Sequence, residues 1–206
     1  YGANSDSAPE IRTNGSTGRV ECANRSNNNA ITDPVSSVGT GWHHFVCTQS
    51  GITISLYKDG SILSSGAVGG AVAGTVPLRI GRRSNDEGGT FEFGGYIDEV
   101  RIYNRALSAA EVSALYNADK AVVTQKAVNN TGLVGYWSFD DATGTIATDY
   151  SGNRNAGTLS GTTKPTWVGG NKRSAIKFDG TTTGQAVFAS SSIPVINTIS
   201  FWIKTN

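Results

Sequence analysis

The chain has 206 residues, enough for one large β-sandwich or two small domains, and 37% of them are apolar, which is ordinary for a folded globular protein. Lysine and arginine total 17 against 16 aspartate and glutamate residues, so the net charge of +1 provides no field that would attract nucleic acid or anionic lipid. No apolar run reaches the length needed to cross a bilayer. We therefore expect neither nucleic acid nor membrane partners.

The composition favours many short strands joined by turns. The chain contains 26 glycines and many Asn, Ser and Thr, which supply turns more often than they build helices. Methionine is absent and the chain opens at Tyr1, from which we expect a processed or excerpted part of a longer polypeptide.

Two cysteines occur, Cys22 and Cys47, and their spacing of 25 positions matches no zinc motif. They form either one disulfide or two buried thiols. The composition is typical of extracellular proteins, which favours the disulfide.

The first part of the chain predicts strands at 18–24, 42–49 and 52–58, where branched or alternating apolar residues are bounded by Gly, Asn and Ser. The pair Asp59-Gly60 follows directly, and Asp-Gly is a preferred pair for a two-residue type I′ hairpin turn. Further strands are predicted at 77–81 and 91–103.

One short helix is predicted at 108–117, because Ser108 and Glu111 form a capping box ahead of apolar residues at helical spacing. Residues 119–131 have no long apolar period and predict a linker. Strands follow at 132–139, 175–178, 185–188 and 198–204. These elements predict an all-β fold with two antiparallel sheets in a jelly-roll sandwich and one short helix.

Several motifs resemble those of laminin-G-like, concanavalin A-like jelly-roll domains. Gly-Leu-Val-Gly-Tyr-Trp-Ser-Phe-Asp at 132–140, Asp-Tyr-Ser-Gly-Asn at 149–153, Ala-Ile-Lys-Phe-Asp-Gly at 175–180 and Ile-Ser-Phe-Trp-Ile-Lys at 199–204 resemble the first half of such a domain. The segments 41–46, 56–60 and 95–108 resemble its second half. The resemblance covers most of the chain.

The order of these halves departs from the family pattern. Residues 1–118 resemble the C-terminal half and residues 132–206 the N-terminal half, so the chain is either an excerpt from a tandem array or a circular permutant. The halves pair either within one chain or between copies, since neither half alone closes a core or satisfies its sheet edges.

The resemblance implies a non-catalytic binding or adhesion module of a repetitive surface protein, secreted or held at the cell surface, with a glycan or surface protein as partner. The inverted halves indicate an alternative, in which the chain is a structural subunit of an extracellular fibre. Such a subunit would self-associate by exchanging β-strands between copies.

Catalysis by a glycosidase of this fold would need two carboxylates close together on a strand. Glu92 and the pair Asp98-Glu99 are the strand carboxylates that lie near one another, and Glu99 is interpreted as a surface ion pair with Arg101. We therefore expect no enzymatic activity.

A structural calcium ion is the cofactor that the resemblance implies, with Asp98, Asp140, Asp179 and Gly180 as the residues that hold it. Calcium binds carboxylate and carbonyl oxygens, which loops rich in Asp, Asn and Gly provide. Asp149 and Asn153 are interpreted equally well as oxygen ligands of such an ion or as residues that only form Asx turns.

Exposed aromatic residues are candidates for stacking on sugar rings, although most of them are expected to be core or edge residues. The ligand-binding candidates are Trp167, Tyr150 and Tyr57, with Tyr96 as a further exposed aromatic. Trp167 is placed in a Pro-Thr-Trp-Val-Gly loop. The other three tryptophans, Trp42, Trp137 and Trp202, are assigned to the sandwich core.

Overall fold

The structure is a computed structural model. It describes residues 9–13, 18–24, 29–34, 38–67, 78–82, 92–120, 130–181, 185–189 and 196–206.

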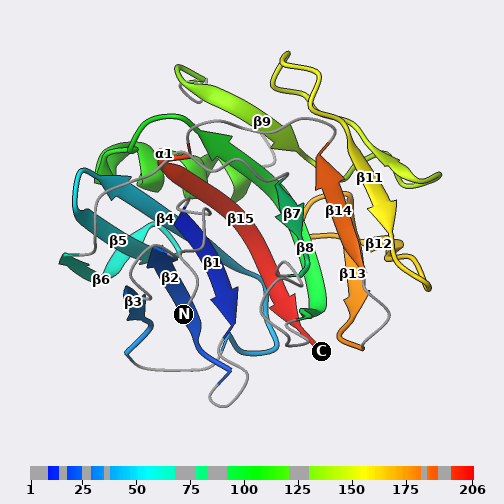
Figure 1. Cartoon of the computed structure of the whole chain (residues 1–206), viewed down its shortest axis with the longest axis horizontal. Coiled ribbons are helices and arrows are strands. Elements are labelled where there is room, and N and C mark those ends of the chain that lie inside the picture. The colour runs from blue at the N-terminus through cyan, green and yellow to red at the C-terminus, as the bar shows by residue number, and fades with distance from the viewer. Residues whose placement is uncertain are drawn as a thin grey trace, which may run out of the picture.

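A large antiparallel sheet of eight strands forms one layer of the molecule (Figure 1). Its strands, in spatial order, are β12 (Thr166–Gly169), β13 (Ser174–Asp179), β8 (Gly94–Tyr103), β15 (Thr198–Thr205), β4 (His43–Ser50), β5 (Thr53–Lys58) and β6 (Ser61–Ala67), and β9 (Leu133–Trp137) also pairs with β8.

Two smaller antiparallel sheets form the other layer. The strands of the first, in spatial order, are β1 (Pro9–Thr13), β2 (Val20–Asn24) and β3 (Asn29–Thr32), and those of the second are β10 (Ile146–Ala147), β11 (Gly157–Ser160), β14 (Ala186–Ala189) and β7 (Arg79–Ile80). Side chains from both small sheets join those of one face of the large sheet in a single apolar cluster. The all-β sandwich predicted from the sequence is confirmed.

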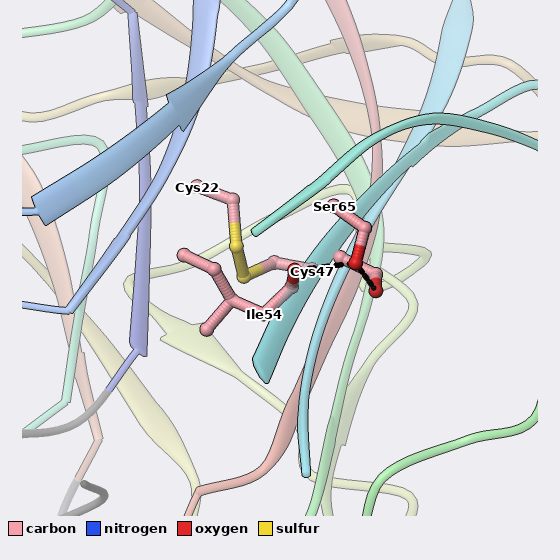
Figure 2. Close-up of a disulfide and its surroundings, with 5 residues drawn as sticks. Cys22, Cys47, Ile54 and Ser65 are labelled. Carbon is pink, nitrogen blue, oxygen red and sulfur yellow. Dashed lines mark hydrogen bonds between the residues drawn. A yellow bond between two sulfur atoms is a disulfide. The ribbon is translucent and has the colours of Figure 1, made fainter. Parts of the chain in front are cut away.

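A disulfide between Cys22 and Cys47 crosses this core, as Figure 2 shows. Cys22 lies on β2 of the first small sheet and Cys47 on β4 of the large sheet, with their Cα atoms 5.7 Å apart. Both residues are fully buried, and Ile54 of β5 lies beside them. The bond therefore ties the two layers together.

Helix α1 (Ala109–Lys120) packs on the opposite face of the large sheet, which we call the helix-side face. The predicted capping box is present, because Ser108 N–H donates to Glu111 Oε2 at 2.9 Å and Glu111 N–H donates to Ser108 Oγ at 3.3 Å. The helix runs into the predicted linker, whose residues 121–129 lie outside the described residues. Within the described part of the chain, no helix is long and apolar enough to cross a membrane.

The predicted type I′ hairpin joins β5 to β6. Asp59 and Gly60 both have positive φ, 51° and 80°, as this turn requires. The Asp59 carboxylate accepts the N–H of His44 at 3.0 Å, which holds the turn against β4.

Strand β15 lies in the middle of the large sheet, between β8 and β4 (Figure 1). Its partners come from the predicted C-terminal half of a domain, whereas β15 itself comes from the predicted N-terminal half. In this structure the two segments therefore pair within one chain. The assignment of the two halves, and their inverted order, stays a prediction.

The strands that the sequence did not predict are short. β1, β3, β10 and β11 have two to five residues each, and β12 was placed in a loop. Their Thr, Ser, Asn and Gly residues resemble turn composition more than a strand pattern, and pairing with a neighbouring strand determines their conformation.

Candidate functional site

Tyr150 is the most exposed aromatic side chain among the described residues, with 55% of its surface accessible. It belongs to the segment 148–155 between β10 and β11, which we call the Tyr150 loop. An aromatic ring that stays in solvent can stack on a ligand, because water leaves its apolar face when the ligand binds. The loop is therefore the first candidate site.

The carboxylate of Asp149 organises this loop. Its Oδ1 accepts the N–H groups of Tyr136 at 2.9 Å and Ser151 at 2.8 Å. Its Oδ2 accepts the N–H of Asn155 at 2.8 Å and the hydroxyl of Ser151 at 2.9 Å. The bond to Ser151 N–H closes the Asx turn that the sequence predicted.

Two asparagines attach the loop to strand β9. Asn153 Nδ2 donates to the carbonyl oxygen of Leu133 at 3.1 Å, and Asn155 Nδ2 donates to that of Val134 at 2.7 Å. In return, Trp137 Nε1 donates to the carbonyl oxygen of Asn155 at 3.0 Å. These bonds hold the loop in one conformation, so a ligand would lose little affinity in ordering it.

Tyr150 rests beside Tyr136 of β9, with ring centroids 6.2 Å apart and planes tilted by 58°. The Tyr136 hydroxyl donates to Glu99 Oε2 at 2.8 Å, and the Arg101 guanidinium lies 4.4 Å from the Tyr136 ring centroid. These contacts hold Tyr136 in place beside Tyr150.

The ion pair between Glu99 and Arg101 adds to these contacts around Tyr136, with Arg101 Nη2 donating to Glu99 Oε2 at 2.7 Å. The sequence interpretation of this pair as a surface pair is wrong, because the side chains are only 3% and 8% exposed. Glu99 also has a positive φ of 53°, next to a register shift between β8 and β15. This irregularity interrupts the regular alternation of side chains along β8.

Two of the four predicted calcium residues contact the same loop, residues 170–174, which follows β12 and includes the first residue of β13, Ser174. Asp98 Oδ2 accepts the N–H of Asn171 at 2.9 Å, and Asp140 Oδ1 accepts the N–H of Ser174 at 3.2 Å. Asp98 is fully buried, and its burial, followed by the nearby carboxylate of Glu99, raises the pKa of Asp98 to about 7.

Asp179 and Gly180 lie elsewhere. Asp179 pairs with Gly94 in the sheet, four positions along β8 from Asp98, and its carboxylate accepts hydrogen bonds from Thr181 and Gln185. The described residues contain no group of three His, Cys, Asp or Glu side chains that could hold a metal ion. The four predicted residues do not form one coordination sphere in this structure, and calcium binding stays a prediction.

Residues 2–113 match the Laminin_G_3 family, described as the concanavalin A-like lectin/glucanases superfamily. The match covers more than half of the 206 residues. The chain belongs to this superfamily. The comparison with curated proteins and the comparison with solved structures each returned no match.

Members of the concanavalin A-like lectin/glucanase superfamily include both lectins and glucanases, so membership suggests a carbohydrate-binding or protein-binding module without excluding hydrolysis. A glucanase needs two carboxylates that reach the scissile bond. Here Glu99 is bonded to Arg101 and Tyr136, and Asp98 accepts the backbone N–H groups of Glu99 and Asn171. Both carboxylates are buried, and both form hydrogen bonds within the protein.

The structure places two of the aromatic candidates differently from what the sequence indicated, and their role in ligand binding stays a prediction. Tyr57 is only 6% exposed because α1 covers it, so it offers no stacking surface. Trp167 is on strand β12 instead of a loop, packs edge-on against Phe139 and donates from Nε1 to the carbonyl oxygen of Gly144. Trp137 lies in the core as predicted, whereas Trp202 is buried on the helix-side face and Trp42 is only half-buried.

The sequence indicated Tyr150 and Asp149 but did not reveal Tyr136 as the partner of Tyr150. Alternation along β9 provides a signal, because Trp137 faces the core and its neighbour must face the other side. The contact itself required the Asp149 bond that draws the loop onto β9.

Proposed function

We propose that the chain is a non-catalytic adhesion module of a repetitive extracellular surface protein, and that it binds a glycan through the Tyr150 loop. The observation that carries this proposal is an exposed tyrosine on a loop held by four hydrogen bonds to one carboxylate. A flat, pre-ordered aromatic ring suits the apolar face of a sugar.

The disulfide supports the extracellular part of the proposal. Cys22 and Cys47 are bonded in the core, and structural disulfides persist in oxidising compartments. Superfamily membership supports the carbohydrate-binding part.

A glycan array probed with the 206-residue chain, followed by titration of the best ligand, tests this function. Tyr150→Ala is expected to weaken binding about tenfold or more, because it removes the stacking surface, while Tyr150→Phe retains most of the affinity. Ile52→Ala is the matched control, since Ile52 is 61% exposed and lies outside the loop.

Equal binding by wild type and Tyr150→Ala would remove the loop from the proposal. A ligand found only among surface proteins would reassign the module to protein binding. Release of reducing sugar from a bound glycan would overturn the non-catalytic assignment.

A second candidate function rests on the position of β15. This strand completes the large sheet from its centre, and the one disulfide among the described residues lies wholly within the N-terminal segment. Residues 130–206 of one copy could therefore occupy the same place in another copy, which would build a fibre by strand exchange.

Light scattering at several concentrations distinguishes the two functions. A mass near 21.5 kDa at every concentration supports a self-contained binding module. Large species whose mass grows with concentration support strand exchange.

A further inference from the structure

A row of three residues crosses the large sheet far from the Tyr150 loop. Lys177 of β13 pairs with Tyr96 of β8, and Tyr96 pairs with Lys204 of β15. Directly paired residues of antiparallel strands place their side chains on the same face. We call these three residues the lysine row.

The lysine row points away from the core. Its neighbours along the strands, Ile176, Phe178, Ile97 and Ile203, all belong to the core cluster. Side chains alternate between the two faces of a strand, so the row lies on the helix-side face. All three of its residues are half-buried, and none is covered completely.

The side chains of the row converge on one ring. Lys177 Nζ lies 5.5 Å and Lys204 Nζ 5.0 Å from the centroid of the Tyr96 ring. The Trp42 ring stands edge-on to Tyr96, with centroids 6.2 Å apart, and is also half-buried. Two ammonium groups therefore flank an aromatic ring, with a second aromatic surface beside them.

Among the described residues, the two positive charges have no carboxylate partner. Neither lysine forms an ion pair with any residue that the structure describes. The nearest carboxylates along these strands are engaged elsewhere: Asp98 with backbone N–H groups, and Asp179 with Thr181 and Gln185. Lys177 and Lys204 stand on the strands at either side of β8, so an anion bound over the row is attracted by both charges.

We propose that the lysine row binds the carboxylate of a uronic acid residue in an acidic polysaccharide, with the sugar ring against Trp42. A carboxylate accepts hydrogen bonds from an ammonium group, and such charge-assisted bonds are stronger than neutral ones. The half-buried Trp42 beside the lysines favours a sugar over a simple anion or an acidic peptide, because a pyranose ring carries an apolar face next to its carboxylate.

The site is separate from the Tyr150 loop. Tyr136, which supports that loop, pairs with Arg101, five residues along β8 from Tyr96, or about 16 Å at the usual rise of a strand. The two sites share no side chain, so a substitution can abolish binding at one site without changing the other.

Binding to polygalacturonate, compared with its fully methyl-esterified form, tests the proposal. The esterified polymer keeps the sugar rings and loses the charge. The double variant Lys177→Gln/Lys204→Gln is expected to bind polygalacturonate about tenfold more weakly or worse. The methyl ester is expected to bind the wild type as weakly as polygalacturonate binds the double variant.

Lys164→Gln is the control, because it removes the same charge from an exposed position in the segment before β12. Tyr150→Ala is expected to leave the binding of polygalacturonate unchanged. Thermal unfolding of each variant shows whether it folds as the wild type does.

Three results would overturn the proposal. The first is no binding of polygalacturonate, and the second is an equal loss with Lys164→Gln, which would show an effect of net charge alone. The third is equally tight, row-dependent binding of polyglutamate, which would assign the site to acidic proteins.

Discussion

The Tyr150 loop and the lysine row lie on the same sandwich but are built in different ways. Side-chain hydrogen bonds from Asp149 and two asparagines hold the loop, and its partners on β9 lie between 13 and 21 residues away in sequence. No side-chain hydrogen bond joins the members of the row, which depends on the register of three strands: β8 from the middle of the chain, and β13 and β15 from its C-terminal part.

This difference decides what each region can tolerate. A loop held by a carboxylate fails when that carboxylate is removed, even if the sheet is intact. A row set by register fails when β15 or β13 shifts, even if every row residue is present, because a shift by one residue moves each side chain to the other face.

The largest expected effect is on the free energy of unfolding, when a core side chain of β15 is truncated. Ile203→Ala removes a side chain that is 3% exposed in the core, next to Lys204, and is expected to cost about 2–5 kcal/mol of unfolding free energy. Urea unfolding checks this value, and Ile203→Val, expected to cost about 0.5–1.5 kcal/mol, is the matched control. Two separate transitions in place of one would show that the segment carrying β15 unfolds alone and would contradict a single cooperative sandwich.

Asp149→Ala should have a somewhat smaller effect that is confined to the loop. It leaves the N–H groups of Tyr136 and Asn155 without their acceptor, which is expected to cost about 2–3 kcal/mol. Amide hydrogen exchange should accelerate at these positions while the amides of β15 keep their protection. Asp149→Asn keeps one acceptor oxygen and is expected to lose less. Faster exchange throughout the large sheet would show that the loop and the sheet are not independent.

The sequence predicted best those features that depend on residues close together in the chain. The Asp59-Gly60 turn, the Ser108–Glu111 capping box and the Asx turn at Asp149 are all present, because each is a contact over three residues or fewer. Binary patterning was also sufficient to find the long strands of the large sheet.

Features set by pairing across the sheet were less accessible to sequence reasoning. Nothing in the neighbourhood of Lys177 or Lys204 shows that both lie beside Tyr96, since this depends on β8 having these two strands as partners. Tyr57 is buried because helix α1 packs over it, and Glu99 is buried where strand β8 is irregular. Neither outcome can be read from the position of these residues in the sequence.

A smaller effect, dependent on pH, is expected at the start of α1. The hydrogen bond from Arg105, followed by that from Ser108 N–H, lowers the pKa of Glu111 from 4.5 to about 2. The unfolded state binds this proton more readily, so the stabilisation is complete above about pH 4.5 and is lost as the pH falls toward 2. Urea unfolding across this range checks the prediction. Glu111→Gln should flatten the dependence, and an equally steep fall in the variant would assign it to other carboxylates.

The smallest expected effect concerns calcium, which would bind residues that are far apart in the sequence. Asp98 and Asp140 lie 42 positions apart in sequence, yet both bond the loop 170–174, and calcium bound there would have to compete with the N–H groups they already accept. We therefore expect weak binding, which at about 10 mM calcium would stabilise the chain by about 1 kcal/mol and raise Tm by about 2–4 °C. Thermal unfolding with calcium or with chelator measures this shift. Asp140→Asn should abolish it, whereas Asp179→Asn should not, because Asp179 pairs with Gly94, four positions along β8 from Asp98. An equal loss in both variants would restore Asp179 to the site and require that this end of β13 approach the loop when the ion binds.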